Sequence, residues 1–493
     1  MGNIHRILLS KRNHVYLLVL FLISSFKLVI AQDINPYTYQ DLSNFSYGKL
    51  RDSLKKNWNC PVLYREKETQ KKYKELWDAR TEFIVGAIDG KNFIQEKEIY
   101  NYIEPIVSQI QAGNPGLMPQ KPILLIDRSA SANAYSIGGN IIAVNLGLIS
   151  FAESREEIAL VIAHELSHNI LEHANHSMKE KSEWLTSAEY KRSLNQVLDS
   201  KYERFTRLKK VFEGYTFSRT RHSRYHEDEA DSLAVVLLKN SHIPFDASFF
   251  LRLDSSDIQY RQQLKQPVKD YFTNINLPFE DWWVHKTTKG LSSKNYNFQN
   301  ADDILDSLKT HPECKERYTK TLAWSVANTR LTPIPASISE KVNKMIIWNI
   351  FDNQNLTACL YRILLEKDKG NKDEWYNFMI HNIFAGLYYS DNQLNRFNSI
   401  KVTSKEYISR QYYELQTMLE QMPKENLETY YTNLGTQVFW QKMPSDARAL
   451  KELFHTLLNK DSSVKTNEIA AKHLTTAYSN SMYCEFADHF ITK

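Results

Sequence analysis

The chain has 493 residues, a formal net charge of +5 at pH 7 and only 14 glycines. So small a charge, with no nucleic-acid-binding motif beside it, gives no reason to expect a nucleic-acid partner. The length predicts two or three structural units, and the scarcity of glycine favours a helix-rich protein.

The first 31 residues have the pattern of a secretory signal. Lys11 and Arg12 precede an apolar run from Val15 to Phe26, and Val29-Ile30-Ala31 has the small-residue spacing of a cleavage site. The run is shorter than the roughly 20 residues that a transmembrane helix needs. We therefore expect an exported protein, periplasmic or extracellular, with an uncleaved, membrane-associated anchor as the alternative.

The next residues, 32–94, are expected to form an N-terminal helical segment, and two apolar runs after them predict strands. Residues 122–127 form the first run and residues 139–145 the second. Gly138 and Gly139 open the second run, and they allow a tight turn or a close approach of the backbone.

Residues 164–168 read His-Glu-Leu-Ser-His, the HExxH pattern. Positions i and i+4 share one face of a helix, so His164 and His168 can bind one zinc ion between them. Glu165 can then reach a water at that ion as a base. Ser154 and Glu157 have capping-box spacing, which predicts that a buried helix begins there and runs through residues 154–173.

A catalytic zinc usually has a third protein ligand. His173 is rejected, because it lies about 140° further round the helix than His168. Glu227 and Asp231 share a face of a predicted helix at 223–238, so one carboxylate can bind zinc while the other accepts a ring N–H from a zinc-bound histidine. The alternative is an acidic, solvated first turn of the helix.

Four blocks in order, residues 133–149, 163–168, 223–231 and 310–317, resemble the HtpX/BepA-like zinc metallopeptidases, the family that includes the CAAX prenyl endopeptidases. The resemblance implies an α+β, mostly α fold. It would consist of a gluzincin-type zinc metallopeptidase domain at 95–330, with a small sheet and an HExxH helix, followed by an α-helical domain.

The resemblance also implies roles for single residues. His164, His168 and Glu227 would bind the zinc, Glu165 would be the catalytic base, and Asp231 would be the acidic residue that follows the third ligand. The sequence departs from the family pattern at two positions: Ile137 stands where many members carry proline, and Ser167 replaces a common glycine inside HExxH. Serine and glycine are both small, so the metal site should survive the second change.

Three further residues are candidates for contact with the substrate or the developing oxyanion: His311, Arg224 and Asn133. The resemblance places His311, in a Thr-His-Pro block, near the metal and gives it a catalytic role. It also suggests that the strand at 139–145 lies along the cleft, where a substrate peptide could pair with it. An ordinary hairpin without a substrate role is the alternative.

Cys60, Cys314, Cys359 and Cys484 form an even set. In an oxidising compartment up to two disulfides are expected, in any of three pairings. The polar stretch at 174–222 separates the two metal-binding blocks. Because no later run approaches 18 apolar residues, we expect no transmembrane segment in the mature chain.

The segment 331–337 resembles a domain boundary, since Pro333 and Pro335 resist helix formation. Residues 338–493 then read as an α-helical domain of unknown role. The helices are predicted at 341–351, 375–389 and 405–421, without the fixed period of a repeat array. A module that recruits partners or substrates is the alternative to aromatic residues that only fill a core.

These patterns together predict a zinc-dependent endopeptidase, with one zinc per chain, that acts on exported or cell-envelope polypeptides in protein quality control. A second hypothesis is a chaperone-like or scaffold protein whose zinc site is latent because His311 closes it, with an envelope protein as partner. A purely structural zinc is a weaker alternative, because structural sites are usually rich in cysteine.

Overall fold

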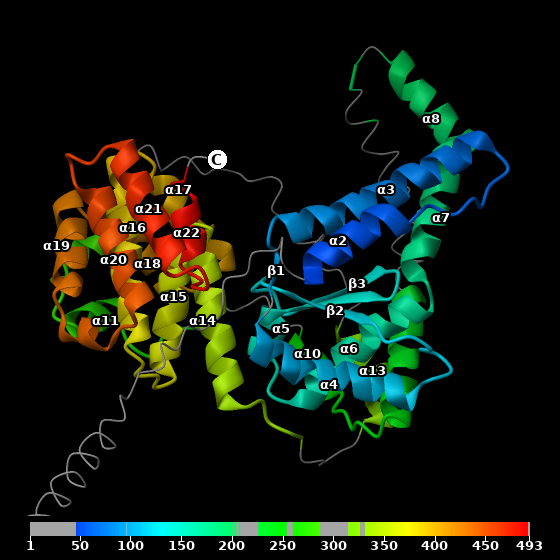
Figure 1. The fold of residues 1–493 in the computed structure, drawn as a ribbon. Helices are drawn as coiled ribbons and strands as arrows, with labels where there is room; N and C mark the ends of the chain where they lie inside the picture. The colour runs from blue at the N-terminus through cyan, green and yellow to red at the C-terminus, as the bar shows by residue number, and fades with distance from the viewer. Residues whose placement is uncertain are drawn as a thin grey trace, which may run out of the picture.

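The computed structural model describes residues 46–94, 96–200, 225–253, 260–285, 314–325 and 331–491, and the single positions 202, 203 and 207. The predicted signal at 1–31, and the candidates Arg224 and His311, lie outside these residues. Within them, no helix combines the length and the apolar character needed to cross a membrane. The fold is mostly helical with one four-stranded sheet, as the resemblance implied (Figure 1).

The sheet has the strand order β1-β2-β4-β3. Its strands are β1 (Phe93–Ile94), β2 (Ile123–Asp127), β3 (Ala134–Gly138) and β4 (Ile141–Asn145). The predicted strands at 122–127 and 139–145 are thus confirmed as β2 and β4. The pair β2–β4 is parallel, and the pairs β1–β2 and β3–β4 are antiparallel.

The expectation that a substrate could pair with the strand at 139–145 is wrong. That strand, β4, is paired on one side with β2 and on the other with β3. Its backbone groups are therefore already used by the sheet, and it offers no free edge. Among the described strands, the edge on this side of the sheet belongs to β3.

The N-terminal helices α2 (Ser46–Asn57) and α3 (Lys67–Asp89) cover one face of the sheet (Figure 1). Ile84 and Ile88 of α3 are buried in a small core with Leu125 and Ile141 of the sheet. This layer is separate from the main core on the other face, so the sheet is covered on both sides.

The other face carries α4 (Lys97–Gly113), α5 (Leu146–Phe151) and α6 (Arg155–Ile170). The capping box at the start of α6 is confirmed: the Ser154 hydroxyl accepts from the Glu157 N–H, and the Glu157 carboxylate accepts from the Ser154 N–H. The helix is shorter than predicted, because Glu172 adopts a left-handed conformation with φ of 52°. The chain then continues as α7 (His173–Thr186) and α8 (Ala188–Asp199).

The predicted helix at 223–238 is present as a helix at residues 225–240. Short helices follow it: α10 (Ser248–Leu253), α11 (Val268–Thr273), η3 (Asp281–Val284), α13 (Cys314–Thr321) and η5 (Leu322–Trp324).

In the residues described from 336 onward, the regular elements of the C-terminal part are all helices. Its elements are α14 (Ala336–Asp352), α15 (Leu356–Asp368), α16 (Trp375–Asn392), α17 (Arg396–Ile400), η6 (Lys405–Tyr407), α18 (Arg410–Gln421), α19 (Lys424–Gly435), η7 (Val438–Lys442), α20 (Ser445–Leu458), α21 (Val464–Ala477) and α22 (Cys484–Asp488). The predicted helices at 341–351 and 375–389 are confirmed within α14 and α16. The third begins later than predicted, because Ser409 caps α18 through the Tyr412 N–H.

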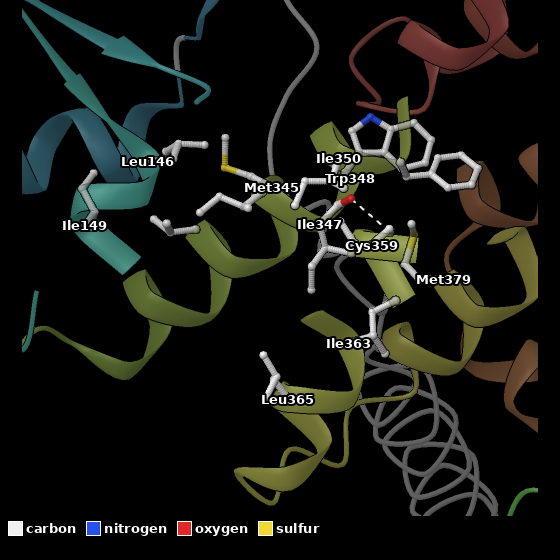
Figure 2. Packing of buried hydrophobic residues seen from close by; sticks show 14 of the residues in the cluster. Leu146, Ile149, Met345, Ile347, Trp348, Ile350, Cys359, Ile363, Leu365 and Met379 are labelled. Atoms are coloured by element: carbon white, nitrogen blue, oxygen red, sulfur yellow. Dashed lines mark hydrogen bonds between the residues drawn. The ribbon is translucent and has the colours of Figure 1, made fainter. Parts of the chain in front are cut away.

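The two parts share one continuous hydrophobic core. The helix α5 packs on α14, with Leu146 toward Met345, and beyond α14 the packing continues through Trp348 toward α15 and α16 (Figure 2). The helix α14 is therefore covered by apolar groups on both sides, and it joins the sheet-containing part to the C-terminal helices.

The disulfides that the even number of cysteines suggested are not formed among the four cysteines, all of which the structure describes. Three of them lie on different helices, and Cys60 lies in the segment between α2 and α3. The Cys359 thiol is buried in α15 and donates to the Ile347 carbonyl, and the Cys484 thiol donates to the Tyr478 carbonyl. Cys60 and Cys314 are only partly buried and lie in the N-terminal layer and at the start of α13.

Candidate metal centre

Two elements bring together the three residues expected to bind metal. The helix α6 carries His164 and His168 one turn apart, and the helix at 225–240 carries Glu227. The two Nε2 atoms lie 3.0 Å apart. The Glu227 carboxylate oxygens lie 3.3 Å from His164 Nε2 and 3.5 Å from His168 Nε2. All three side chains can therefore reach one ion.

These separations fit a tetrahedral zinc ion. Zinc bonds of about 2.0–2.2 Å at tetrahedral angles place neighbouring ligand atoms about 3.3 Å apart. Two imidazoles and one carboxylate are also the donor set of known catalytic zinc sites. His164 and Glu227 are buried, where lone pairs that face each other need a cation between them.

The charge around His164 favours a cation at this point. Burial and the charge of Arg317 act to lower the pKa of His164. The hydrogen bonds to Asp231 and Glu227 outweigh both and raise it to about 9. In the absence of a metal, a proton on His164 supplies the positive charge that the two carboxylates attract.

Asp231 holds the ring of His164 from behind. Its Oδ1 lies 2.9 Å from His164 Nδ1, so the ring donates its Nδ1–H to the carboxylate and turns Nε2 toward the metal position. Arg317 donates to the same carboxylate through Nε at 2.8 Å and Nη2 at 2.6 Å. Burial alone would raise the pKa of Asp231, but Arg317 and His164 hold it well below its usual range.

Arg317 is a site residue to which the sequence analysis assigned no role. It lies on α13 in the block at 310–317, and its guanidinium is buried 4.4 Å from the ring centroid of Phe250. No spacing rule connects α13 with Asp231, because the two residues lie on different helices and their charges meet only in the folded chain.

His173 contacts the Nδ1 atom of His168, as Asp231 contacts that of His164. The two Nδ1 atoms lie 2.8 Å apart. With Nε2 of His168 turned to the metal position, its Nδ1 carries the proton and donates it to His173. Burial, followed by the charge of His226, lowers the pKa of His173 to about 4, so its ring is a neutral acceptor. The ring of His173 also stacks on that of His226, with centroids 4.2 Å apart.

Glu165 belongs to α6, and its side chain reaches the edge strand β3. It is buried, and its Oε2 accepts the backbone N–H of Ser136 at 2.8 Å. Ser136 pairs with Ile142 in β4 at a position where the strand's own N–H points outward. The Ser136 hydroxyl also donates to Asn169 Oδ1 at 2.9 Å, which joins β3 to the next turn of α6.

Comparison with known proteins agrees with this geometry. Residues 95–325 match peptidase family M48. This segment is an M48 metallopeptidase domain. The chain is also 29% identical over 146 residues to a Vibrio cholerae serotype O1 protein named beta-barrel assembly-enhancing protease. The alignment covers 28% of this chain and 29% of that protein, so it spans less than a third of the relative's length.

The remaining site candidates of the M48 domain stay predictions. Asn133 directly precedes β3, where its carbonyl accepts from the Asn145 N–H at 3.1 Å and its own N–H donates to the Ser131 carbonyl at 2.8 Å. His311 and Arg224 lie outside the described residues.

Proposed function

We propose that this chain is a zinc-dependent endopeptidase that cleaves exported or cell-envelope polypeptides in protein quality control. The observation that carries the proposal is the meeting of His164, His168 and Glu227 at ligand spacing, with Glu165 beside them. The name of the Vibrio cholerae relative and the signal pattern at 1–31 support envelope substrates.

A zinc ion held by these three residues would act as a Lewis acid, polarising a carbonyl and lowering the pKa of water. Glu165 would take a proton from the attacking water on its carboxylate and pass it to the leaving amine. The Ser136 N–H fixes one oxygen of that carboxylate. Asp231 and His173 keep the two histidine rings in the required tautomer.

The edge strand β3 is the natural place for an extended substrate. In the antiparallel pair with β4, alternate residues of β3 turn their N–H and C=O groups away from the sheet. Ala134 is one of them, and Ser136 is another by the same alternation, although its N–H is already donated to Glu165 and a substrate could use only its C=O unless Glu165 moves. A peptide that pairs with this edge would lie between β3 and α6, beside Glu165. The correction from β4 to β3 thus moves the expected substrate strand closer to the base.

The direct test is Glu165→Gln. The purified variant should lose cleavage of an unfolded polypeptide almost entirely while its zinc content equals that of the wild type, because the amide cannot accept the proton. Zinc is measured by atomic emission and cleavage by the appearance of new peptide ends. Undiminished cleavage by the variant would remove Glu165 from the mechanism.

The location is tested separately. The proposal predicts that the native host yields the protein in an exported fraction, with an N-terminus at or near residue 32 by mass spectrometry. A protein that starts at residue 1 in the cytoplasmic fraction would refute export and leave the peptidase assignment untouched.

A further inference from the structure

One arginine of the N-terminal layer lies outside the matched M48 segment, yet it contacts both β3 and α7 beside the site. Arg80, on α3, places its guanidinium carbon 4.2 Å from the ring centroid of Trp58 and 4.1 Å from that of Trp77. The Trp77 indole N–H donates to the Trp58 carbonyl at 2.9 Å. The two rings are therefore fixed to each other, and Arg80 is held against both of them.

The Nη1 atom of Arg80 has two neighbours from different elements. It donates to Asn175 Oδ1 at 3.0 Å, in the first turn of α7. It also occupies the space over Gly138, the last residue of β3, where a Cβ atom would lie 2.8 Å from it. A Cβ atom on Gly139 would likewise lie 2.9 Å from Cζ2 of Trp58. Because Gly138 and Gly139 have no Cβ atom, Arg80 and Trp58 can pack against the end of the β3–β4 hairpin.

Burying the Arg80 guanidinium costs free energy of folding, so this side chain does more than fill space. The Nε and Nη2 atoms of Arg80 are buried and make no hydrogen bond. Burial lowers the pKa of this arginine to about 10. A buried charge with only neutral partners opposes folding, and an apolar side chain would fill the space without that cost. What the guanidinium adds is a donor to Asn175 in a flat group that fits beside two indole rings.

We propose that Arg80 is a positioning residue that holds the end of the edge strand β3 against the start of α7, and so sets the position of Ser136 beside Glu165. Gly138 is two residues from Ser136, whose N–H binds Glu165. Asn175 is two residues from His173, which contacts His168. The inference rests on the proposed function in one respect, that Glu165 acts on a substrate bound at β3.

The test compares Arg80→Met with wild type. Methionine keeps an unbranched chain between the rings and removes the donor and the charge. Two quantities are measured on the zinc-loaded, full-length protein, well below its unfolding temperature: hydrogen exchange of the amides at 134–140 and 173–176, and kcat and KM on a peptide. We expect exchange at both segments to accelerate at least about tenfold, and kcat/KM to fall about 10- to 100-fold, mainly through kcat, since small misplacement of catalytic groups has effects of that size.

Two further variants make the result specific. Arg51→Met removes an exposed arginine of α2 that pairs with Asp89, and it should change neither quantity. Gly138→Ala leaves Arg80 in place but forces a Cβ into its Nη1 at a φ of 84°, and it should reproduce the Arg80→Met effects in both assays.

Each result is decisive. If Arg80→Met exchanges as the wild type does at 134–140, or if exchange rises while kcat and KM stay unchanged, Arg80 does not position β3 for the reaction. If the wild type cleaves no peptide, the proposed function fails, and the exchange data still decide whether Arg80 fixes β3 to α7.

Discussion

Each histidine expected to bind the metal has a second residue in contact with its Nδ1 atom. His164 has Asp231 at its Nδ1, and Asp231 in turn has Arg317. His168 has the neutral ring of His173. Because a carboxylate and an imidazole differ in charge, the two ligand histidines have unequal surroundings, and His164 has the more strongly polarised ring.

Removing the third ligand should release the metal. In Glu227→Ala the two remaining histidines hold zinc with only two bonds, so we expect zinc content after dialysis against a weak chelator to fall well below one ion per chain. Glu229→Ala is the matched control, since Glu229 lies on the same helix with its Oε2 3.4 Å from His173 Nε2. Equal zinc content in the two variants would assign the third ligand elsewhere.

Replacing His173 should weaken zinc without removing a ligand. In His173→Ala the Nδ1–H of His168 loses its acceptor, and loss of such a partner typically costs about 10- to 100-fold in metal affinity. Competition with a chromophoric chelator measures this, and His176→Ala, an exposed change on the same helix, should bind as the wild type does. Wild-type affinity in His173→Ala would show that water replaces the ring at no cost.

The sequence could predict the candidate ligands in part because the spacing within each pair is local, whereas the choice of Glu227 over Asp231 came from the family resemblance. The turn between His164 and His168, and the turn between Glu227 and Asp231, are properties of single helices. The contacts of Arg317 and Arg80 join elements distant along the chain, and no periodicity carries that information. His173 was close enough in sequence to be considered, but the break in the helix at Glu172 redirected its side chain toward His168.

At the scale of elements, the buried strands were easier to predict than the edge strand. The strands β2 and β4 are continuous apolar runs because both have a neighbour on each side and layers above and below. The strand β3 has a mixed pattern of Ala134, Tyr135, Ser136 and Ile137, since it lies at the edge of the sheet and has only one neighbouring strand. A short edge strand with a polar residue in it gives a weaker pattern than a continuous apolar run.

The helix α16 contains a titratable group that should limit acid stability. Burial is the main cause that lowers the pKa of His381 to about 4, below the value near 6.5 of an unfolded histidine. The unfolded chain binds this proton first, so the contribution is complete above about pH 6.5 and is lost as pH falls toward 4.

Thermal unfolding from pH 7 to 4.5 tests the role of His381. Acidification over that window should cost the wild type roughly 3 kcal/mol through this histidine. His381→Gln takes up no proton there, so its Tm should fall less than that of the wild type between pH 7 and pH 4.5. Parallel Tm curves for the two proteins would place the acid sensitivity in other groups.

At the scale of the whole molecule, charged and polar contacts join the M48 domain to the C-terminal helices. Arg128, after β2, donates to Glu485 of α22 at 2.6 Å, and the Trp348 indole of α14 donates to the same carboxylate oxygen at 3.2 Å. Lys341 of α14 reaches Glu96 at 3.0 Å. The last helix of the chain thus returns to the sheet-containing part.

Removing the shared carboxylate should separate the unfolding of the two parts. Glu485→Ala leaves Arg128 mostly buried without its anion, which costs about 3–5 kcal/mol for buried pairs. We expect urea unfolding to shift to lower concentration and to show two steps. Asp488→Ala, which breaks the exposed pair with Lys91, should cost less than about 1 kcal/mol. Equal effects of the two variants would contradict the structural role of the junction.

The continuous core at α5 and α14 also has a consequence for synthesis. The ribosome completes residues 95–325 before it makes α14, so the face of α5 around Leu146 emerges without the helix that it packs against in the finished protein. Until α14 follows, this apolar face is exposed to water and open to association with other chains. A nascent chain arrested between residues 325 and 336 should therefore depend on a holding chaperone that the full-length chain no longer needs.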